Sequence, residues 1–552
     1  MKYALNEHPK ALYVFLLLWF LAGAIQGALM PLSGEEAYYW LFSKNLQWGY
    51  LDHPPAVAFF AYLGGLIAPG EFGARLFSSI LSTATLWLLY DLCGKKNLRL
   101  FIFMVLGLLA VHAGSFLIKT DVPLLFFETL FFWFYKRYLA REGFREVIGL
   151  AVAIVGMLLS KYHGVLIVFF TLLSFPKLVL KPSFWGIVLL SLILLSPHIY
   201  WLYLNDWSSF VFHLNDRADI SFKSSNVLSY VLSQPVVLGP LVSFPVFLAL
   251  LKQPTKDHFN RALQWVFCGV LIFFLIQSFR VFIHKHWTSV VLVPMMLLAF
   301  EPLSQSTTLA LWVRRLSRVS LFCFVLFRVY LSYDYLPASI SKGLEPLHHW
   351  KIWAQELEEL SQGYPIVFIN SYENASRYEF YSGNAAHTLS TVYFNNTQFD
   401  YWGGEHAFRD RKVLLVHHKR DQEGFETYTA SNNARIYYRF VDRFRAFDRL
   451  SISIAPLEDR RFALTISNPY DFEIKSEPES PVTLKAYLLE GERIIKEHTL
   501  ISSLQMKPKE TLLDTFEMDL TTEVDRFHLR FGVQAGTLPP TINSNRLTLS
   551  SN

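Results

Sequence analysis

Long apolar runs separated by short polar loops fill the chain up to about residue 336. Several runs approach the roughly 20 apolar residues that a membrane-spanning helix needs, and together they predict about eleven spans. The predicted spans are 11–30, 72–90, 100–118, 122–139, 147–160, 163–176, 184–204, 227–250, 262–279, 288–301 and 317–335. The apolar stretch 54–68 ends at Pro69-Gly70, which favours a re-entrant or interfacial piece over a crossing.

The pattern changes after residue 336, where the chain takes on the alternation typical of a water-soluble region. A polar helix near 350–360 and two short strands, 366–369 and 413–417, predict an α/β domain over 337–450. Strands separated by turn residues predict a β-sandwich-like domain over 451–552; they lie at 450–454, 461–466, 482–489 and 527–531. The predicted fold class is therefore a mainly α-helical polytopic membrane domain, 1–336, followed by a soluble α/β plus β-rich region.

Composition agrees with this division and excludes some classes of protein. The 552 residues are 52% hydrophobic and only 17% charged, which is not the profile of a soluble enzyme. The net charge of +5 is small for this length, and the cations cluster in short loops, so nucleic acid is not an expected partner. With the N-terminus in the cytoplasm, most loop lysines and arginines face the cytoplasm, as the positive-inside rule requires. An odd number of spans then places the C-terminal region outside the cytoplasm.

The loops predicted on the outer face carry most of the candidate chemistry. Glu35 and Glu36 lie in the first loop with Asp52 and His53, and further loops carry other ionisable side chains. These are Lys119, Asp121, Lys161, Arg280, Lys285 and His286. Carboxylates suit proton transfer or metal binding, and lysines suit a phosphate. Because ionisable residues at the edge of a membrane bundle are functional candidates, the pattern predicts an active site on the outer membrane face.

Simpler structural roles compete with these interpretations. Ser33 and Glu36 have the spacing of a capping box, so Glu36 is either a base or only part of a helix cap. Glu35 points about 100° away from Glu36 and has no such role. Asp52 fits a turn before two prolines, Asp121 fits a helix N-cap, and His286 fits an interface anchor. A lysine between two apolar segments, as at Lys161, is costly unless it snorkels or binds an anion.

Several motifs occur in order along the chain. They are Gly-Glu-Glu-Ala-Tyr-Tyr-Trp (34–40), Gly-Tyr-Leu-Asp-His-Pro-Pro (49–55), Arg75-Leu76, Lys-Thr-Asp-Val-Pro-Leu (119–124), Leu-Ser-Lys-Tyr (159–162), Ser196-Pro197, Asn-Asp-Trp-Ser (205–208) and His-Lys-His-Trp (284–287). With these motifs the chain resembles the membrane-embedded GT-C class of glycosyltransferases, specifically the bacterial aminoarabinose transferase and protein O-mannosyltransferase group, which uses polyprenyl-phosphate sugars. The motifs cover about the first 300 residues, and the segment from Asn370 to Trp402 resembles the start of the soluble domain in the aminoarabinose transferase branch.

The resemblance implies roles for particular residues. The acidic residue of the first outer loop, usually the Asp of an Asp-Glu pair, is taken as the catalytic base, and here it is Glu35 or Glu36. The family's second-loop aspartate falls on Asp121, which is a further catalytic candidate, and the anion-facing lysine falls on Lys161. The pair before the prolines falls on Asp52 and His53. Some members bind a divalent cation, so the metal candidates are Asp52, Asp121 and His286.

The implied reaction is a single inverting displacement on a polyprenyl-phosphate sugar. In it, Glu35 deprotonates an acceptor on a lipid, glycan or protein, while Lys161 holds the donor phosphate. Further donor-side or site candidates are Arg75, Tyr162, Arg280, Tyr39, His53 and Lys285. No Gly-rich phosphate loop follows a strand, so no nucleotide cofactor is expected. The resemblance also implies a bacterial inner-membrane location.

Two other functions remain open at this point. A transporter or flippase of a lipid-linked sugar also has many spans with buried charges, but its site is expected near the bilayer midplane between repeats. No convincing internal repeat is present in this sequence. A polysaccharide ligase would share the general design with the predicted transferase.

Overall fold

The computed structural model describes residues 9–212, 223–251, 257–335, 347–403, 405–418, 424–457, 461–491, 493–517 and 527–548. These residues divide into two compact units. The first, called the helical unit, contains residues 9–32, 39–207 and 223–335. The second, called the soluble unit, contains residues 33–38, 208–212 and the described residues from 347 onward. The predicted domain boundary at 336/337 lies outside the described residues.

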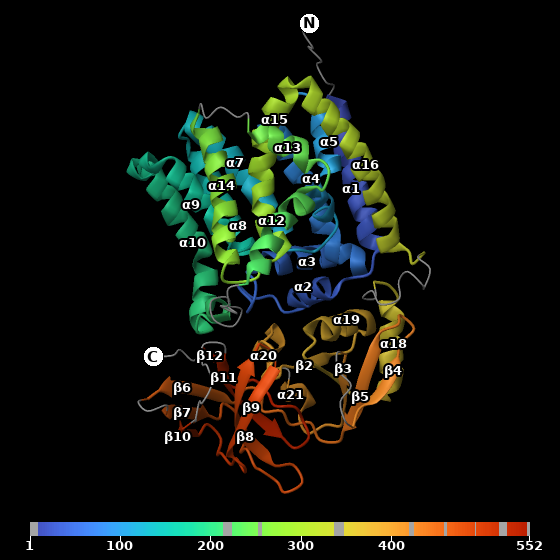
Figure 1. Ribbon diagram of the computed structural model, residues 1–552, viewed down its shortest axis with the longest axis vertical. Helices are drawn as coiled ribbons and strands as arrows, with labels where there is room; N and C mark the ends of the chain where they lie inside the picture. The colour runs from blue at the N-terminus through green and yellow to red at the C-terminus, as the bar shows by residue number, and fades with distance from the viewer. Residues whose placement is uncertain are drawn as a thin grey trace. The chain divides into compact units, whose positions relative to one another are not determined.

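The helical unit consists of helices joined mostly by short loops (Figure 1). In chain order these are α1 (Pro9–Leu29), α2 (Gly34–Lys44, whose first turn belongs to the soluble unit), α3 (Ala56–Ile67), α4 (Gly70–Leu92), α5 (Leu98–Gly107), α6 (Leu109–Ala113), α7 (Asp121–Ala140), α8 (Phe144–Ser160), α9 (Gly164–Ser174), η1 (Pro176–Leu180), α10 (Pro182–Leu204), α12 (Ser224–Leu238), α13 (Ser243–Leu250), α14 (His258–Ser278), η3 (Lys285–Val291), α15 (Leu292–Gln305) and α16 (Thr307–Ser332).

Five helical segments of the described residues are long and apolar enough to cross a membrane by themselves, as expected of a multi-pass membrane protein. They are Pro9–Leu29, Gly70–Leu92, Pro182–Leu204, His258–Ser278 and Lys285–Gln305. A sixth is possible if α12 and α13, which meet at a bend of 103°, form one broken span. The predicted count of about eleven is therefore not confirmed. The predicted span 100–118, for example, breaks at Leu108 into α5 and α6.

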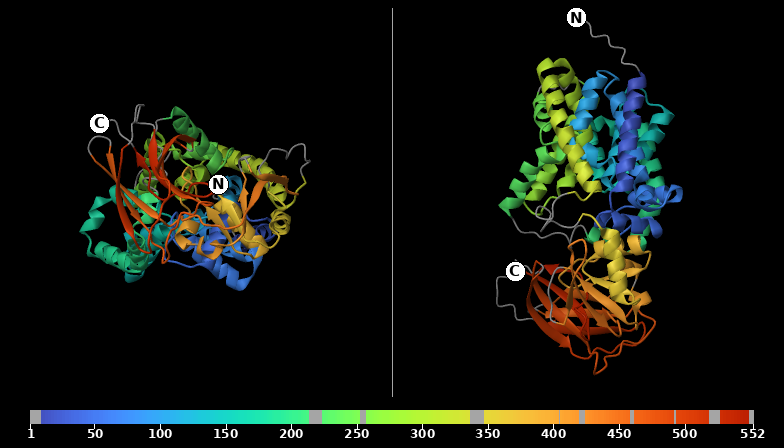
Figure 2. Two further views of the ribbon diagram at one scale, coloured as in Figure 1. Left: turned by 90° about the horizontal axis from the view of Figure 1, so that it is seen from below. Right: turned by 90° about the vertical axis from the view of Figure 1, so that its right-hand side faces the viewer.

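Polar side chains fix the ends of several helices inside this bundle. The C-terminal parts of α1 and α16 lie close to each other (Figure 1 and Figure 2), and Arg328 joins them there. Its guanidinium donates to the Ala22 carbonyl at 3.1 Å and to the Gln26 side chain at 3.4 Å. Buried Arg75 donates to the carbonyls of Gly27, Met30 and Pro31 at the end of α1. The last carbonyls of a helix have no hydrogen-bond donor within it. Arg75 supplies donors to the carbonyls at the end of α1.

Helices α7 and α8 form a close antiparallel hairpin. The connection between them contains only residues 141–143, so the start of α7 returns next to the end of α8. Glycines let the two helices approach, because a Cβ on Gly149 or Gly156 would lie 2.3 Å from a ring carbon of Phe134 or Phe127. This hairpin determines where Asp121 and Lys161 lie.

The soluble unit begins with a mixed α/β sheet. Its elements are α18 (Trp350–Ser361), β1 (Ile366–Ile369), α19 (Tyr372–Ser382), β2 (Ala386–Leu389), α20 (Gln398–Trp402), α21 (Glu405–Phe408), β3 (Val413–His417), β4 (Glu426–Thr429) and β5 (Arg435–Val441). The strand order is β2-β1-β3-β5-β4, in which β1 pairs in parallel with β2 and β3, and β5 pairs antiparallel with β3 and β4. The predicted strands at 366–369 and 413–417 coincide with β1 and β3.

Two antiparallel sheets complete the soluble unit. Their strands are β6 (Ser451–Pro456), β7 (Arg461–Ser467), β8 (Val482–Glu490), β9 (Arg493–Ile501), β10 (Thr511–Glu517), β11 (His528–Ala535) and β12 (Leu547–Thr548). The sheets have the orders β10-β7-β6 and β12-β11-β8-β9. Leu464 of the first sheet and Leu484 and Phe531 of the second belong to one buried core. The sheets therefore pack as a sandwich, and the predicted combination of helical domain, α/β sheet and β-rich region is confirmed.

Candidate active site

A buried ion pair connects the two ends of the α7–α8 hairpin. The Lys161 Nζ lies 2.8 Å from Oδ1 of Asp121, and the hydroxyl of Ser289 donates to the same oxygen at 2.5 Å. Lys161 is 4% exposed and Asp121 is 9% exposed, so little water reaches them. Breaking such a pair by removing one partner costs about 3–5 kcal/mol, because the other charge is left buried and uncompensated.

The position of each partner follows from its place on a helix. Asp121 is the first residue of α7, where the positive end of the helix dipole favours an anion. Lys161 immediately follows α8, and its backbone N–H bonds to the Met157 carbonyl at the end where a cation is favoured. The short hairpin brings these two ends together, so the fold stabilises both charges before any ligand binds.

Other candidates surround the loops next to this pair. The Tyr162 hydroxyl lies 3.4 Å from Nε2 of His198 on α10, and the other ring nitrogen of His198 lies 2.6 Å from the Trp48 carbonyl. The Tyr39 hydroxyl lies 3.0 Å from Nε2 of His53. Within the helical unit, the structure therefore connects the first loop, the 161–163 loop and α10 through polar contacts.

The remaining predicted residues of the helical unit occupy different environments. Arg75 is bonded to the carbonyls at the end of α1, which accounts for its burial without a ligand. Asp52 is half-buried, whereas Arg280, Lys285 and His286 are exposed. Among the described residues, no group of three or more His, Cys, Asp or Glu side chains is arranged to hold a metal ion. A metal bound by Asp52, Asp121 and His286 stays a prediction.

The two glutamates at the start of α2 have different surroundings. Oε2 of Glu36 accepts from the backbone N–H of Ser33 at 3.1 Å and from its hydroxyl at 3.0 Å, and the Ser33 hydroxyl accepts from the Glu36 N–H at 3.4 Å. The predicted capping box is thus present, and Glu36 is fully buried within it. Glu35 lies in the same turn but is only half-buried. Glu35 is the more accessible of the two carboxylates.

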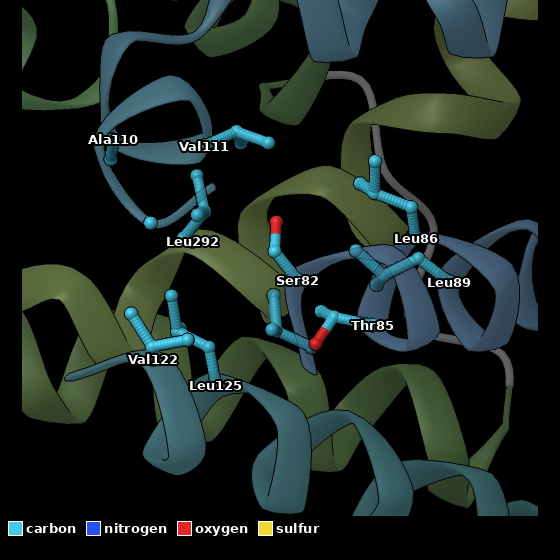
Figure 3. A pocket seen from close by; sticks show the side chains of 11 residues that line it. Ser82, Thr85, Leu86, Leu89, Ala110, Val111, Val122, Leu125 and Leu292 are labelled. Carbon is cyan, nitrogen blue, oxygen red and sulfur yellow. The ribbon is translucent and has the colours of Figure 1, made fainter. Parts of the chain in front are cut away.

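An apolar cavity lies beside the N-terminal part of α7 (Figure 3). Figure 3 shows leucine and valine side chains of α4, α7 and α15 pointing into a common space, together with Ser82. The hydroxyl of Ser82 accepts from the indole N–H of Trp19 at 3.1 Å. The lining includes Val122 and Leu125, one residue and four residues after Asp121. The lining is mostly apolar, and the cavity volume of about 30 Å³ has room for only one or two water-sized groups.

Two residues near the ion pair were not singled out by the sequence. Ser289 is a small polar residue in the predicted span 288–301, and His198 lies within the apolar run 184–204. The available signals were weak: Ser289 follows the His-Lys-His-Trp motif, and His198 follows Ser196-Pro197. Both take their roles from contacts with residues more than 100 positions away.

A second group of ionisable side chains is buried in the soluble unit. The carboxylate of Glu405 accepts from the backbone N–H groups of Ala446 and Phe447, each at 3.0 Å, and from the Tyr470 hydroxyl at 2.8 Å. Burial and the neighbouring Asp448 charge raise the pKa of Glu405 to about 8. Nε2 of His387 lies 3.3 Å from Oδ2 of Asp448, but not in hydrogen-bond geometry.

Comparison with known proteins adds to this picture. Residues 52–201 match the family described as dolichyl-phosphate-mannose-protein mannosyltransferase. The fold matches the apo crystal structure of ArnT from Cupriavidus metallidurans with a TM-score of 0.54, at 12% identity, over 78% of this chain and 98% of that one. The undecaprenyl phosphate-bound structure of the same protein matches with a TM-score of 0.55, at 13% identity, with the same coverage. No curated protein matches the sequence.

The chain has a GT-C glycosyltransferase fold. The family match and the fold agree with the predicted class, a multi-pass membrane glycosyltransferase. The matched segment of this GT-C chain contains Asp52, Arg75, Asp121 and Lys161, and it begins after Glu35. The segment that matches the family model therefore includes both residues of the ion pair. The roles of individual residues are proposals.

Proposed function

We propose that this glycosyltransferase moves a sugar from a polyprenyl-phosphate donor to an acceptor hydroxyl or phosphate on the extracytoplasmic face of a bacterial inner membrane. The observation that carries the proposal is the buried Lys161, which Asp121 holds between two helix ends of an apolar helical unit. A polyprenyl phosphate combines an anionic head with a hydrocarbon tail. The Lys161 ammonium group suits the head, and the apolar helices of the same unit suit the tail.

Lys161 is assigned to the donor phosphate. An ammonium group has three N–H donors, and the described bond to Asp121 uses one of them, which leaves donor capacity for phosphate oxygens. Asp121 and Ser289 fix the direction of the ammonium group and compensate its charge when no donor is bound. The undecaprenyl phosphate bound to ArnT, which shares the fold, supports this class of donor.

Glu35 is assigned as the base for a hydroxyl acceptor. The acceptor oxygen gives its proton to the Glu35 carboxylate and forms a bond to the anomeric carbon, while the bond from that carbon to the donor phosphate breaks. The configuration inverts, and the released polyprenyl phosphate keeps its negative charge beside Lys161. Glu36 serves the helix cap and is not needed in this step. A metal ion bound near Asp52 would stabilise the same phosphate charge.

The test compares Glu35→Gln with Glu36→Gln. We expect Glu35→Gln to lower transfer from lipid-linked sugars extracted from the same cells by about 100-fold or more, a typical loss for a general base. Glu36→Gln keeps an acceptor oxygen for the cap and should retain most activity. Transfer measured in detergent also separates this function from transport, because transport needs a sealed membrane.

A cellular experiment identifies the acceptor. Mass spectrometry of surface glycolipids and glycoproteins should reveal a sugar that is present with the wild-type chain and absent with Glu35→Gln. Unchanged glycans in cells that contain folded Glu35→Gln protein would contradict the proposed base.

A further inference from the structure

The first turn of α2, which carries Glu35, packs as part of the soluble unit. Tyr38 is 2% exposed and its ring centroid lies 4.5 Å from that of Tyr372, the first residue of α19. The same ring stacks on Phe399 of α20 at 6.2 Å with planes 13° apart. Tyr38 is therefore enclosed by the N-terminal ends of α19 and α20, two helices of the α/β region.

The Tyr38 hydroxyl also completes the N-terminus of α20. The first N–H groups of a helix have no partner within it. At α20, the Thr397 and Asp400 side chains form a capping box. The N–H of Gln398, the first residue of α20, donates to the Tyr38 oxygen at 2.7 Å. A residue of α2 thus satisfies a backbone donor that the capping box leaves open.

A glycine allows the close approach on the other side of the turn. A Cβ on Gly34 would lie 2.3 Å from Oε2 of Glu373 and 2.4 Å from its Cβ, and real Cβ atoms do not come so close. Any side chain at position 34 would push the first turn of α2 away from α19. Gly34 and Tyr38 are four residues apart and share one face of the helix. Contacts at both positions fix the rotation and height of the turn between them.

This contact occupies a place where α/β proteins usually bind ligands. α19 starts just after the carboxyl end of β1, which lies between its parallel neighbours β2 and β3. Ligands of open α/β sheets bind in the crevice outside the carboxyl ends of such strands. In this chain, the helix start beside that edge packs against residues 33–38 of the same chain.

We infer that the soluble α/β sheet positions the catalytic base, with Tyr38 and Gly34 as positioning residues that act through Glu35. The inference rests on the proposed function, since it takes Glu35 as the base. It gives the soluble unit a part in the reaction that needs no contact with donor or acceptor. Glu35 lies three residues before Tyr38, so a shift of the turn moves the carboxylate with it. A misplacement of about 1 Å can cost on the order of 100-fold in rate.

The experiment measures initial rates of the full chain in detergent against the concentration of lipid-linked sugars extracted from the same cells. Tyr38→Phe keeps the ring and removes the hydroxyl, and we expect kcat to fall roughly 10-fold. Gly34→Ala should lower kcat further, and Gly34→Ala combined with Glu373→Gly should restore part of it by reopening the space. The donor KM should stay within about twofold throughout, since Lys161 is unchanged.

Two further comparisons separate positioning from a general loss of stability. In a Glu35→Gln background, Tyr38→Phe should cause no additional loss, because there is no base left to misplace. Tyr470→Phe removes a comparable buried hydroxyl bond elsewhere in the soluble unit and should keep wild-type kcat.

The outcomes distinguish the two proposals. Wild-type kcat in folded Tyr38→Phe, together with loss of activity in Glu35→Gln, overturns the positioning role and leaves the base intact. Wild-type activity in folded Glu35→Gln overturns the proposed base itself, and the positioning role with it. If Gly34→Ala does not fold, Tyr38→Phe and its double variant decide the question.

Discussion

A buried carboxylate in the helical unit and one in the soluble unit are neutralised in different ways. Asp121 is paired with an ammonium group at 2.8 Å. Glu405 is instead held by backbone N–H groups and a tyrosine hydroxyl, with the carboxyl group of Asp448 nearby. The first arrangement keeps two opposite charges in place. The second favours a carboxylic acid that retains its proton, and the pKa of Glu405 is raised to about 8.

The difference indicates separate purposes. Burying an ammonium group costs free energy, and a bound anion can interact with that group. The ion pair therefore suits a binding site. The Glu405 cluster joins α21 to the chain leading into β6 and to Tyr470, and all of its described hydrogen bonds are internal. It suits the internal stability of the soluble unit. Variants at the two clusters should therefore affect different properties.

The largest effect is expected at Lys161. Lys161→Met should abolish transfer, by about 100-fold or more, and lower the free energy of unfolding by about 3–5 kcal/mol, because Asp121 is left as an unpaired buried charge. Adding Asp121→Asn should recover much of the stability but none of the activity. Thermal unfolding and transfer rates in detergent would check both parts. Recovered transfer in the double variant would show that Lys161 serves only as the partner of Asp121.

A smaller effect is expected from pH on the soluble unit. The folded pKa of Glu405 is about 8, above the 4.5 of a free glutamate, so between these values the folded state binds more protons than the unfolded state. Stability should therefore fall as pH rises from about 4.5 to about 8, by up to about 5 kcal/mol. Glu405→Gln should flatten part of this dependence.

Hydrogen exchange of β6 and β7 peptides in the full chain, corrected for intrinsic rates, would measure it. Glu490→Gln, at an exposed position, is the control and should keep the wild-type profile. A wild-type pH profile in Glu405→Gln would assign the dependence to other groups.

The smallest effect is expected at Ser289. Ser289→Ala removes one of the two described bonds to Asp121 and should cost ~1–2 kcal/mol of stability, with a rise of a few-fold in donor KM. Ser317→Ala is the matched control, because its hydroxyl bonds the Phe103 carbonyl in the same unit. We expect similar stability loss there and unchanged kinetics. If the two variants had the same donor KM, Ser289 would have no specific role in donor binding.

The sequence predicted the elements whose signals are local. β1 and β3 are apolar runs between turn residues, and both were predicted with their observed bounds. β2 has the sequence Ala-His-Thr-Leu, and only its pairing with β1 makes it a strand. α16 starts at Thr307, ten residues before the predicted span, because Ser306 caps it and arginines lie inside its first half. Because of these charged residues, hydropathy did not predict that part of the helix.

The individual residues of the site could be predicted from the sequence, but the contacts between them could not. Asp121 and Lys161 stood out because each is ionisable beside apolar segments. Their contact spans 40 positions and depends on the α7–α8 hairpin. The capping box of Ser33 and Glu36 needed only local spacing and was predicted. The enclosure of Tyr38 joins positions 360 apart, and no pattern around residue 38 indicates it.

The membership of residues 33–38 in the soluble unit has a practical consequence for dissecting this protein. A fragment starting near residue 347 would lack the tyrosine that fills the space between α19 and α20, and would expose the Gln398 N–H. A synthetic peptide of sequence Ser-Gly-Glu-Glu-Ala-Tyr could supply that tyrosine in trans. Complementation of this kind would turn a six-residue stretch of the transferase into a reporter of how its soluble half folds.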